Sequence, residues 1–273
     1  MGFVDIISNF MQMTAWGMEK PKAYGLFHLS FMLIGFALCG FLAWRLRRVN
    51  EKANRAILLT SGIFLLICEL YKQLFYTFVV NPGERYTWWI FPFQLCSIPM
   101  YFCIIIPLLR KGKLRRSLAN FVVAYNLLGG AIAFLEPSGL FHEYWTLTLH
   151  ALVWHMMLVF VGLYVGFSGQ GCSEKHDYKS ATLTFLSLCC VAFAINCIFW
   201  KASEGTINMF FIGPRVSSLI IVQQIGEAFG WYVGTLCYIP AVCLGAFVVY
   251  KIFYRINNKK KAQAPVIREK QLV

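Results

Sequence analysis

Six polar side chains that could take part in chemistry fall inside long apolar runs of the sequence: Glu69, Lys72, Cys96, Asn126, His150 and His155. At a helical rise of 1.5 Å per residue, all six lie about 9 to 16 Å below one predicted membrane surface. Ionisable groups within the hydrocarbon are costly, so they usually face a cavity or one another. Their shared depth therefore predicts one polar site inside a membrane.

Cys96 and His155 are the candidate catalytic residues of this site. A neutral imidazole can take the proton of a thiol and create a nucleophilic thiolate, which is the chemistry of Cys–His acyl-transfer enzymes. A carboxylate or an amide would orient the imidazole, and Glu69 or Asn126 lies at a suitable depth. Spacing alone does not establish contact, so packing between helices and a transport pathway remain alternatives.

Glu69 and Lys72 lie three residues apart on one helical face, so we expect them to pair. Such a pair fits a buried salt bridge that fixes packing as well as it fits a catalytic role. The cysteines other than Cys96 are interpreted as small packing residues, because no Cys-x-x-Cys or Cys–His spacing of a zinc site is present. The sequence predicts neither a metal nor a cofactor.

The composition excludes an ordinary soluble enzyme. Of the 273 residues, 59% are hydrophobic and 14% are charged, and the mean hydropathy is +0.61, whereas soluble domains carry about 25% charged residues. The net charge of +13 comes from short basic clusters between apolar runs, which is typical of the positive-inside rule and not of nucleic-acid binding. We expect an all-α, polytopic membrane protein with phospholipids, not nucleic acids, as its partners.

The apolar runs predict about seven transmembrane helices, each of roughly 20 residues. Nineteen of the 25 basic residues fall on one face and five on the other, which predicts an N-terminus outside and a C-terminus in the cytoplasm. We expect one transmembrane domain over residues 1–250, a basic, disordered cytoplasmic tail over 251–273, and an interfacial or re-entrant helix within Gly205–Gly230. The predicted spans are Tyr24–Trp44, Ala56–Val79, Ile90–Leu109, Ser117–Leu135, Tyr144–Phe167, Ala181–Trp200 and Trp231–Tyr250.

Several short motifs resemble those of a known family. They are Phe91–Ile98 (Phe-Pro-Phe-Gln-Leu-Cys-Ser-Ile), Gly129-Gly130-Ala131 leading to Pro137, His155–Leu158 (His-Met-Met-Leu), and Gly205–Phe210 followed by Pro214. In this order and spacing they resemble the YwaF-like integral membrane family, which includes transmembrane protein 164, over most of Ala56–Tyr250.

The resemblance implies an acyltransferase that moves fatty acyl groups onto lysophospholipids, with its catalytic cysteine and histidine at Cys96 and His155. It implies a ping-pong reaction through an acyl-cysteine, with Asn126 or Gln94 as the oxyanion stabiliser. A distant similarity to membrane hydrolases of the androgen-induced protein group leaves lipid hydrolysis as an alternative. His150 competes with His155 for the role of base.

Two departures from the family bear on substrate choice. The family commonly has Asn-Tyr-Met where this chain has Ile207-Asn208-Met209, and Trp-Pro where it has Phe229-Gly230. The main rival function is a transporter or channel, whose activity would survive Cys96→Ala but depend on Glu69 or Lys72. A seven-span receptor shares the topology, but short loops and the lack of paired extracellular cysteines in the sequence disfavour it.

Overall fold

In a computed structural model, residues 2–263 are described, and within this range the chain is helical with a single isolated β-bridge between Gly17 and Tyr144. Over the same residues, six helical segments are long and apolar enough to cross a membrane. Their backbone polar groups are satisfied within each helix, as hydrocarbon requires. The six are α2 (Leu26–Leu46), α3 (Glu51–Phe75) continued by the π-turn η1 (Tyr76–Val80), α5–η3–α6 (Lys113–Phe121, Val122–Asn126, Leu127–Leu135), α7 (Trp145–Phe167), α8 (Asp177–Ile198) and α10 (Trp231–Gln263).

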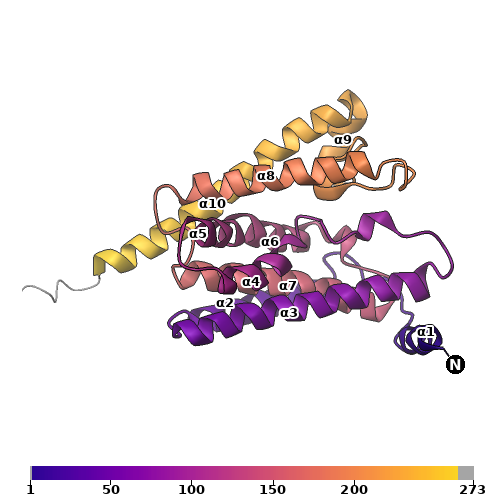
Figure 1. Cartoon of the computed structure of the whole chain (residues 1–273), viewed down its shortest axis with the longest axis horizontal. Helices are drawn as coiled ribbons and strands as arrows, with labels where there is room; N and C mark the ends of the chain where they lie inside the picture. The colour runs from indigo at the N-terminus through magenta and orange to yellow at the C-terminus, as the bar shows by residue number, and fades with distance from the viewer. Residues whose placement is uncertain (1, 264–273) are drawn as a thin grey trace, which may run out of the picture.

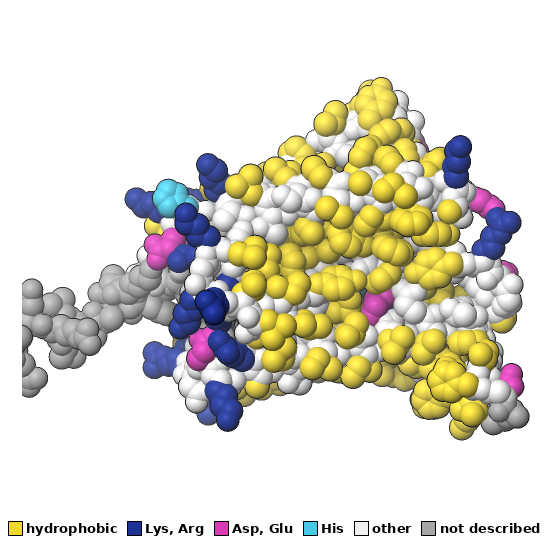
Figure 2. Space-filling model, in the orientation of Figure 1, with side chains coloured by type: hydrophobic (Ala, Val, Ile, Leu, Met, Phe, Trp, Pro, Cys, Tyr) yellow, Lys and Arg dark blue, Asp and Glu magenta, His cyan; other side chains and the backbone are white. Residues whose placement is uncertain are grey.

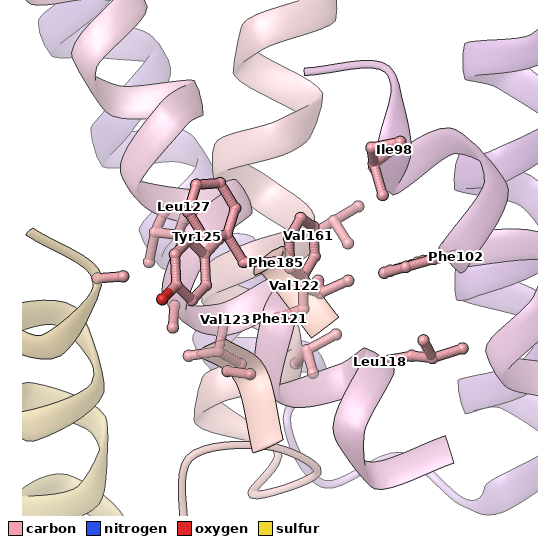
Figure 3. Packing of buried hydrophobic residues seen from close by; sticks show 14 of the residues in the cluster. Ile98, Phe102, Leu118, Phe121, Val122, Val123, Tyr125, Leu127, Val161 and Phe185 are labelled. Atoms are coloured by element: carbon pink, nitrogen blue, oxygen red, sulfur yellow. The ribbon is translucent and has the colours of Figure 1, made fainter. Parts of the chain in front are cut away.

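The long helices lie side by side along one axis of the molecule, and the N-terminus and the C-terminal end of α10 lie at opposite ends (Figure 1). The segment α5–η3–α6 and α7 are the most buried of them. Around them, Phe121, Tyr125 and Phe185 stack with ring centroids 5.5 and 4.5 Å apart, and Val122 and Val161 lie beside the stack (Figure 3). The two buried helices thus form the rigid centre of the bundle.

The predicted span Ile90–Leu109 differs from the other six. It begins at the end of a 3-10 turn, η2 (Trp88–Ile90), continues as an irregular stretch, and then forms an 11-residue helix, α4 (Ile98–Leu108). Eleven residues cover about 16 Å, roughly half of the hydrocarbon thickness. Pro92 lies in the irregular stretch and Pro99 in the first turn of α4. Proline is readily accepted in the first turn of a helix, where its missing N–H has no intrahelical partner, so Pro99 favours a helix start here. A further proline, Pro107, lies inside α4 close to its end.

Four further helical segments lie within the described residues. Helix α1 (Phe3–Met13) lies beside the end of α3 (Figure 1), and the sequence did not predict it. Between α8 and α10 lie two short turns of helix, the 3-10 turn η5 (Met209–Phe211) and α9 (Ile220–Phe229), so Gly205–Gly230 does not span. A third 3-10 turn, η4 (Pro137–Gly139), follows α6.

The C-terminal boundary also differs from the prediction of a disordered tail from residue 251. Helix α10 continues to Gln263, because Lys, Arg, Gln and Ala in this stretch all favour helix. The rest of the predicted tail, 264–273, lies outside the described residues.

Basic side chains gather at one end of the bundle, and hydrophobic side chains cover its middle (Figure 2). At the basic end, Glu51 accepts a hydrogen bond from Arg115 at 2.7 Å and lies 3.8 Å from Lys111. The basic loops Arg45–Arg55 and Arg110–Arg116, predicted on one face, therefore meet. Which side of a membrane this end faces stays a prediction.

Candidate active site

Cys96 lies immediately before the N-cap residue of α4, Ser97. Its thiol is free and its residue is half-buried. The first N–H groups of a helix lack intrahelical partners and carry partial positive charge, so this position favours an anion. At the start of α4 most of these groups are engaged or missing: the Ser97 N–H donates to the Gln94 carbonyl oxygen at 2.8 Å, the Met100 N–H donates to the Ser97 carbonyl oxygen at 3.2 Å, and Pro99 has no N–H. The Ile98 N–H is therefore the donor that the start of α4 offers beside the thiol.

Trp154 of α7 holds the Cys96 segment in place. Its indole Nε1–H donates to the Cys96 carbonyl oxygen at 3.1 Å. The ring of His150 stacks on it with centroids 5.7 Å apart, and the Lys72 ammonium lies 5.9 Å from its ring centroid. Trp154 is only 4% exposed and is the shared neighbour of three predicted site residues, although sequence reasoning missed it.

The two histidines each keep one basic nitrogen. Nδ1 of His155 lies 2.8 Å from the Ala151 carbonyl oxygen, and Nε2 of His150 lies 3.0 Å from the Cys68 carbonyl oxygen. A carbonyl oxygen only accepts, so these nitrogens carry the hydrogen and the neutral rings keep a lone pair on His155 Nε2 and His150 Nδ1. Across the described residues, no hydrogen bond joins the Cys96 sulfur to either imidazole, and both histidines remain candidates for the base.

Glu69 and Lys72 form the predicted pair, with Lys72 Nζ 2.9 Å from Glu69 Oε2. Their side chains are 5% and 19% exposed, respectively. Gln73, which sequence reasoning also missed, donates to the other carboxylate oxygen of Glu69 at 2.7 Å. The Lys72 ammonium lies 5.9 Å from the ring centroid of Trp154, whose indole N–H donates to the Cys96 carbonyl oxygen. The pair therefore lies beside the segment that carries Cys96, and its catalytic role stays a prediction.

The Gln94 side chain bonds the backbone of the turn at Asn208 and Phe210. Its Oε1 accepts from the Phe210 N–H at 3.0 Å, and its Nε2 donates to the Asn208 carbonyl oxygen at 3.1 Å. Phe210 and Phe211 both have φ of 58°, a left-handed conformation that is strained for a bulky residue. Gln94 therefore ties this strained turn to the segment that carries Cys96.

Asn126 lies in the π-turn η3 and is 2% exposed. Its Nδ2 donates to the carbonyl oxygens of Val122 and Leu158, at 3.3 and 3.0 Å, while its Oδ1 has no partner. Asn126 thus braces α7 one turn from His155. Since the amide hydrogens of both Gln94 and Asn126 are engaged, their oxyanion role stays a prediction.

No three side chains of His, Cys, Asp or Glu gather within residues 2–263 in a way that could hold a metal ion. The arrangement offers a thiol, two imidazoles, an ammonium–carboxylate pair and the Ile98 N–H at the start of α4. These are the components of nucleophilic chemistry with proton transfer.

Comparison with models of known protein families shows to which family the chain belongs. The model of the TMEM164 family matches residues 23–262 of the 273. The chain belongs to the TMEM164 family. Comparisons with curated proteins and with solved structures found no match. The resemblance to transmembrane protein 164 is thereby confirmed, while the wider YwaF-like grouping stays a prediction.

The TMEM164 match and the six apolar helices together indicate a multi-pass membrane protein. All candidate site residues lie within the matched range, as does the strained turn at Phe210. Helix α1 precedes it. The candidate site is therefore built entirely from the part of the chain that the family shares.

Proposed function

We propose that this TMEM164-family protein is a membrane-embedded acyltransferase that moves acyl groups between phospholipid and lysophospholipid through an acyl-cysteine on Cys96. The observation that carries the proposal is the position of Cys96 at the start of the half-helix α4, with its carbonyl held by Trp154, the residue next to His155. At this helix start the Ile98 N–H is the candidate donor to the oxyanion. Phospholipid esters are buried just below the headgroups, within reach of an intramembrane thiol.

The first half-reaction cleaves the donor ester. His155 Nε2 takes the thiol proton, and the Cys96 sulfur attacks the ester carbonyl carbon. The tetrahedral intermediate breaks its bond to the glycerol oxygen, which takes the proton from the imidazolium and leaves as a lysophospholipid hydroxyl. A thioester on Cys96 remains.

The second half-reaction reverses the first with a new acceptor. His155 takes the proton of a lysophospholipid hydroxyl, whose oxygen attacks the thioester carbonyl carbon. The carbon–sulfur bond breaks, and the thiolate recovers the proton from the imidazolium. Lys72, held by Glu69, offsets the negative charge that the site carries while the sulfur is ionised. With water as the acceptor, the same steps release a fatty acid, which is the hydrolase alternative.

A turnover assay tests the proposal. Purified protein in lipid nanodiscs would receive a phospholipid labelled on one acyl chain and an unlabelled lysophospholipid, with labelled phospholipid and free fatty acid measured separately. The acceptor carries a different headgroup from the donor, so that labelled phospholipid with the acceptor's headgroup reports acyl transfer. We expect Cys96→Ala to abolish this product and the free fatty acid. Cys103→Ala, which removes a buried thiol from α4, the helix that follows Cys96, should leave turnover near that of the unmodified protein. Turnover that survives Cys96→Ala would refute the proposed nucleophile.

The histidines and the transporter alternative are tested in the same system. We expect His155→Gln to lower turnover by about 10²–10⁴-fold, the usual contribution of a general base. A loss confined to His150→Gln would assign the base to His150. Solute flux that survives Cys96→Ala and disappears in Glu69→Gln, without acyl transfer in any variant, would favour the transporter.

A further inference from the structure

A small pocket of about 150 Å³ lies at the end of the bundle near α1, where the π-turn η1 meets the loop that follows it. Its walls combine opposite charges with aromatic rings. The loop contributes Glu84, Arg85 and Tyr86, and η1 contributes Tyr76. The Asn81 amide donates to the Thr87 hydroxyl at 2.7 Å and closes this loop.

The chemistry of these walls matches a group that carries both charges. A carboxylate next to phenol rings favours an ammonium, which is attracted by the carboxylate and by the faces of the rings. A guanidinium favours a phosphate, to which it donates in a fork. Arg85 pairs with Glu204 from the loop after α8, and both side chains are largely exposed. Since exposed pairs contribute little stability, a phosphate can replace Glu204 at small cost.

The pocket is connected to the candidate active site by hydrogen bonds. The Tyr86 hydroxyl donates to Gln73 Oε1 at 2.9 Å, and Gln73 Nε2 donates to Glu69 Oε1 at 2.7 Å. Burial and the Glu69 carboxylate raise the pKa of Tyr86 to about 12, so the phenol stays a donor at neutral pH. Gln73 Nε2 also donates to the carbonyl oxygen of Ile90, a residue of the pocket wall, at 2.9 Å. The pocket and the Glu69–Lys72 pair therefore form one continuous polar network.

From this geometry we infer that the pocket binds the headgroup of a zwitterionic phospholipid, a phosphate diester that carries an amine. Glu84 with the rings of Tyr76 and Tyr86 receives the ammonium, and Arg85 receives the phosphate. The pocket lies at the end of α3, and Cys96 lies further inside the bundle. In a phospholipid the ester likewise lies deeper than the headgroup. The identity of this lipid as substrate rests on the proposed function, but its binding does not.

Binding measurements test the inference without any turnover. Cys96→Ala protein in detergent would be titrated with three lipids of one acyl chain: a lysophospholipid with phosphate and amine, lysophosphatidic acid with phosphate alone, and a monoacylglycerol with neither. We expect the zwitterionic lipid to bind about tenfold more tightly than lysophosphatidic acid, a difference within the usual range for one desolvated cation–π contact. We expect the monoacylglycerol to bind most weakly.

Variants locate the site of the preference. Glu84→Gln should remove the preference for the lipid that carries the amine. Arg85→Gln should lower the affinity for both phosphate-bearing lipids to nearly that of the monoacylglycerol. Glu143 is exposed and does not line the pocket. The control variant Glu143→Gln should therefore bind all three lipids as the parent protein does. These positions are exposed, so the variants should keep the thermal midpoint of the parent.

Equal binding of the three lipids, or a preference that survives both Glu84→Gln and Arg85→Gln, would overturn the inference. Tighter binding of lysophosphatidic acid than of the zwitterionic lipid would also overturn it, because the pocket would then select phosphate alone. If the proposed acyl transfer is wrong and the pocket is right, the headgroup preference persists in a protein without turnover. The two failures are therefore distinguishable.

Discussion

Replacing Gly130 by alanine tests how closely the helix that carries His155 must be held. Gly130 lies in α6, where a Cβ atom would come within 2.9 Å of Leu158 Cβ, 3.2 Å of Val159 N and 3.3 Å of the His155 carbonyl oxygen. These atoms belong to the backbone of α7 or are fixed to it, so they yield only if the helix moves. Gly129, its neighbour in α6, has nothing within 4 Å of an added Cβ.

Both substitutions raise helix propensity, but only Gly130→Ala also crowds the neighbouring helix α7. Each gains about 0.5–1 kcal/mol because alanine is a better helix former than glycine. Only Gly130→Ala also overpacks a tight contact, which typically costs about 1–3 kcal/mol. The shared gain cancels in the comparison, so we expect Gly130→Ala to be less stable than Gly129→Ala by about 1–3 kcal/mol.

Thermal unfolding in detergent measures this difference. At roughly 2–4 °C per kcal/mol, the midpoint of Gly130→Ala should lie several degrees below that of Gly129→Ala. In the turnover assay Gly130→Ala should also be the slower variant, because displacement of α7 misplaces His155. Equal midpoints and equal turnover in the two variants would refute the close packing of α6 on α7 as the support of the site.

Three further predictions concern the polar groups. Glu69→Gln should destabilise the protein by about 3 kcal/mol, because the charge of Lys72 then stays buried without its partner. The double variant Glu69→Gln with Lys72→Met should recover part of the lost unfolding midpoint. Asn196→Ala should cost about 1–3 kcal/mol, because the buried Met209 N–H loses its bond of 2.6 Å to Asn196 Oδ1, whereas the Met209 carbonyl oxygen still accepts from the Ile212 N–H at 3.3 Å. Denaturant unfolding measures this loss of stability. Burial and nearby Lys20 lower the pKa of His142 from 6.5. As the pH falls, the unfolded chain therefore takes up a proton at this histidine before the folded protein does, so the free energy of unfolding should decrease below about pH 6.5. The unfolding midpoint of His142→Gln should depend less on pH than that of the parent protein between about pH 7.5 and 5.5, which bracket the ordinary pKa.

The sequence predicted the parts of the fold that depend on local pattern. Hydrophobic length alone identifies the six long helices, because backbone satisfaction in lipid leaves few alternatives. The pairing of Glu69 with Lys72 follows from their spacing of three residues on one helix. The break before α4 was visible only as prolines, which a spanning helix tolerates whenever neighbouring helices satisfy the freed groups. Sequence does not show whether they do so.

The residues that sequence reasoning missed act over long separations. Trp154 reaches the Cys96 carbonyl across 58 positions of the chain. The need of a buried indole N–H for a partner was a usable signal, but it does not say which partner. Gln73 is an uncharged residue near the end of α3 whose sequence position does not distinguish it, although it bonds Glu69, Ile90 and Tyr86. Asn126 was predicted at the depth of the site and Gln94 as an oxyanion stabiliser. In the structure the Asn126 amide donates to backbone carbonyl oxygens, and Gln94 bonds the strained turn at Phe210.

Trapping the covalent intermediate tests the central claim most directly. Purified protein would be incubated with a phospholipid donor in the absence of any lysophospholipid, quenched in acid, and examined by intact mass and peptide mapping. We expect one acyl group on the peptide that contains Cys96, released by neutral hydroxylamine as a thioester is, present in Cys103→Ala and absent in Cys96→Ala. An acyl group on another residue, or acyl transfer that proceeds in Cys96→Ala protein, would contradict the account.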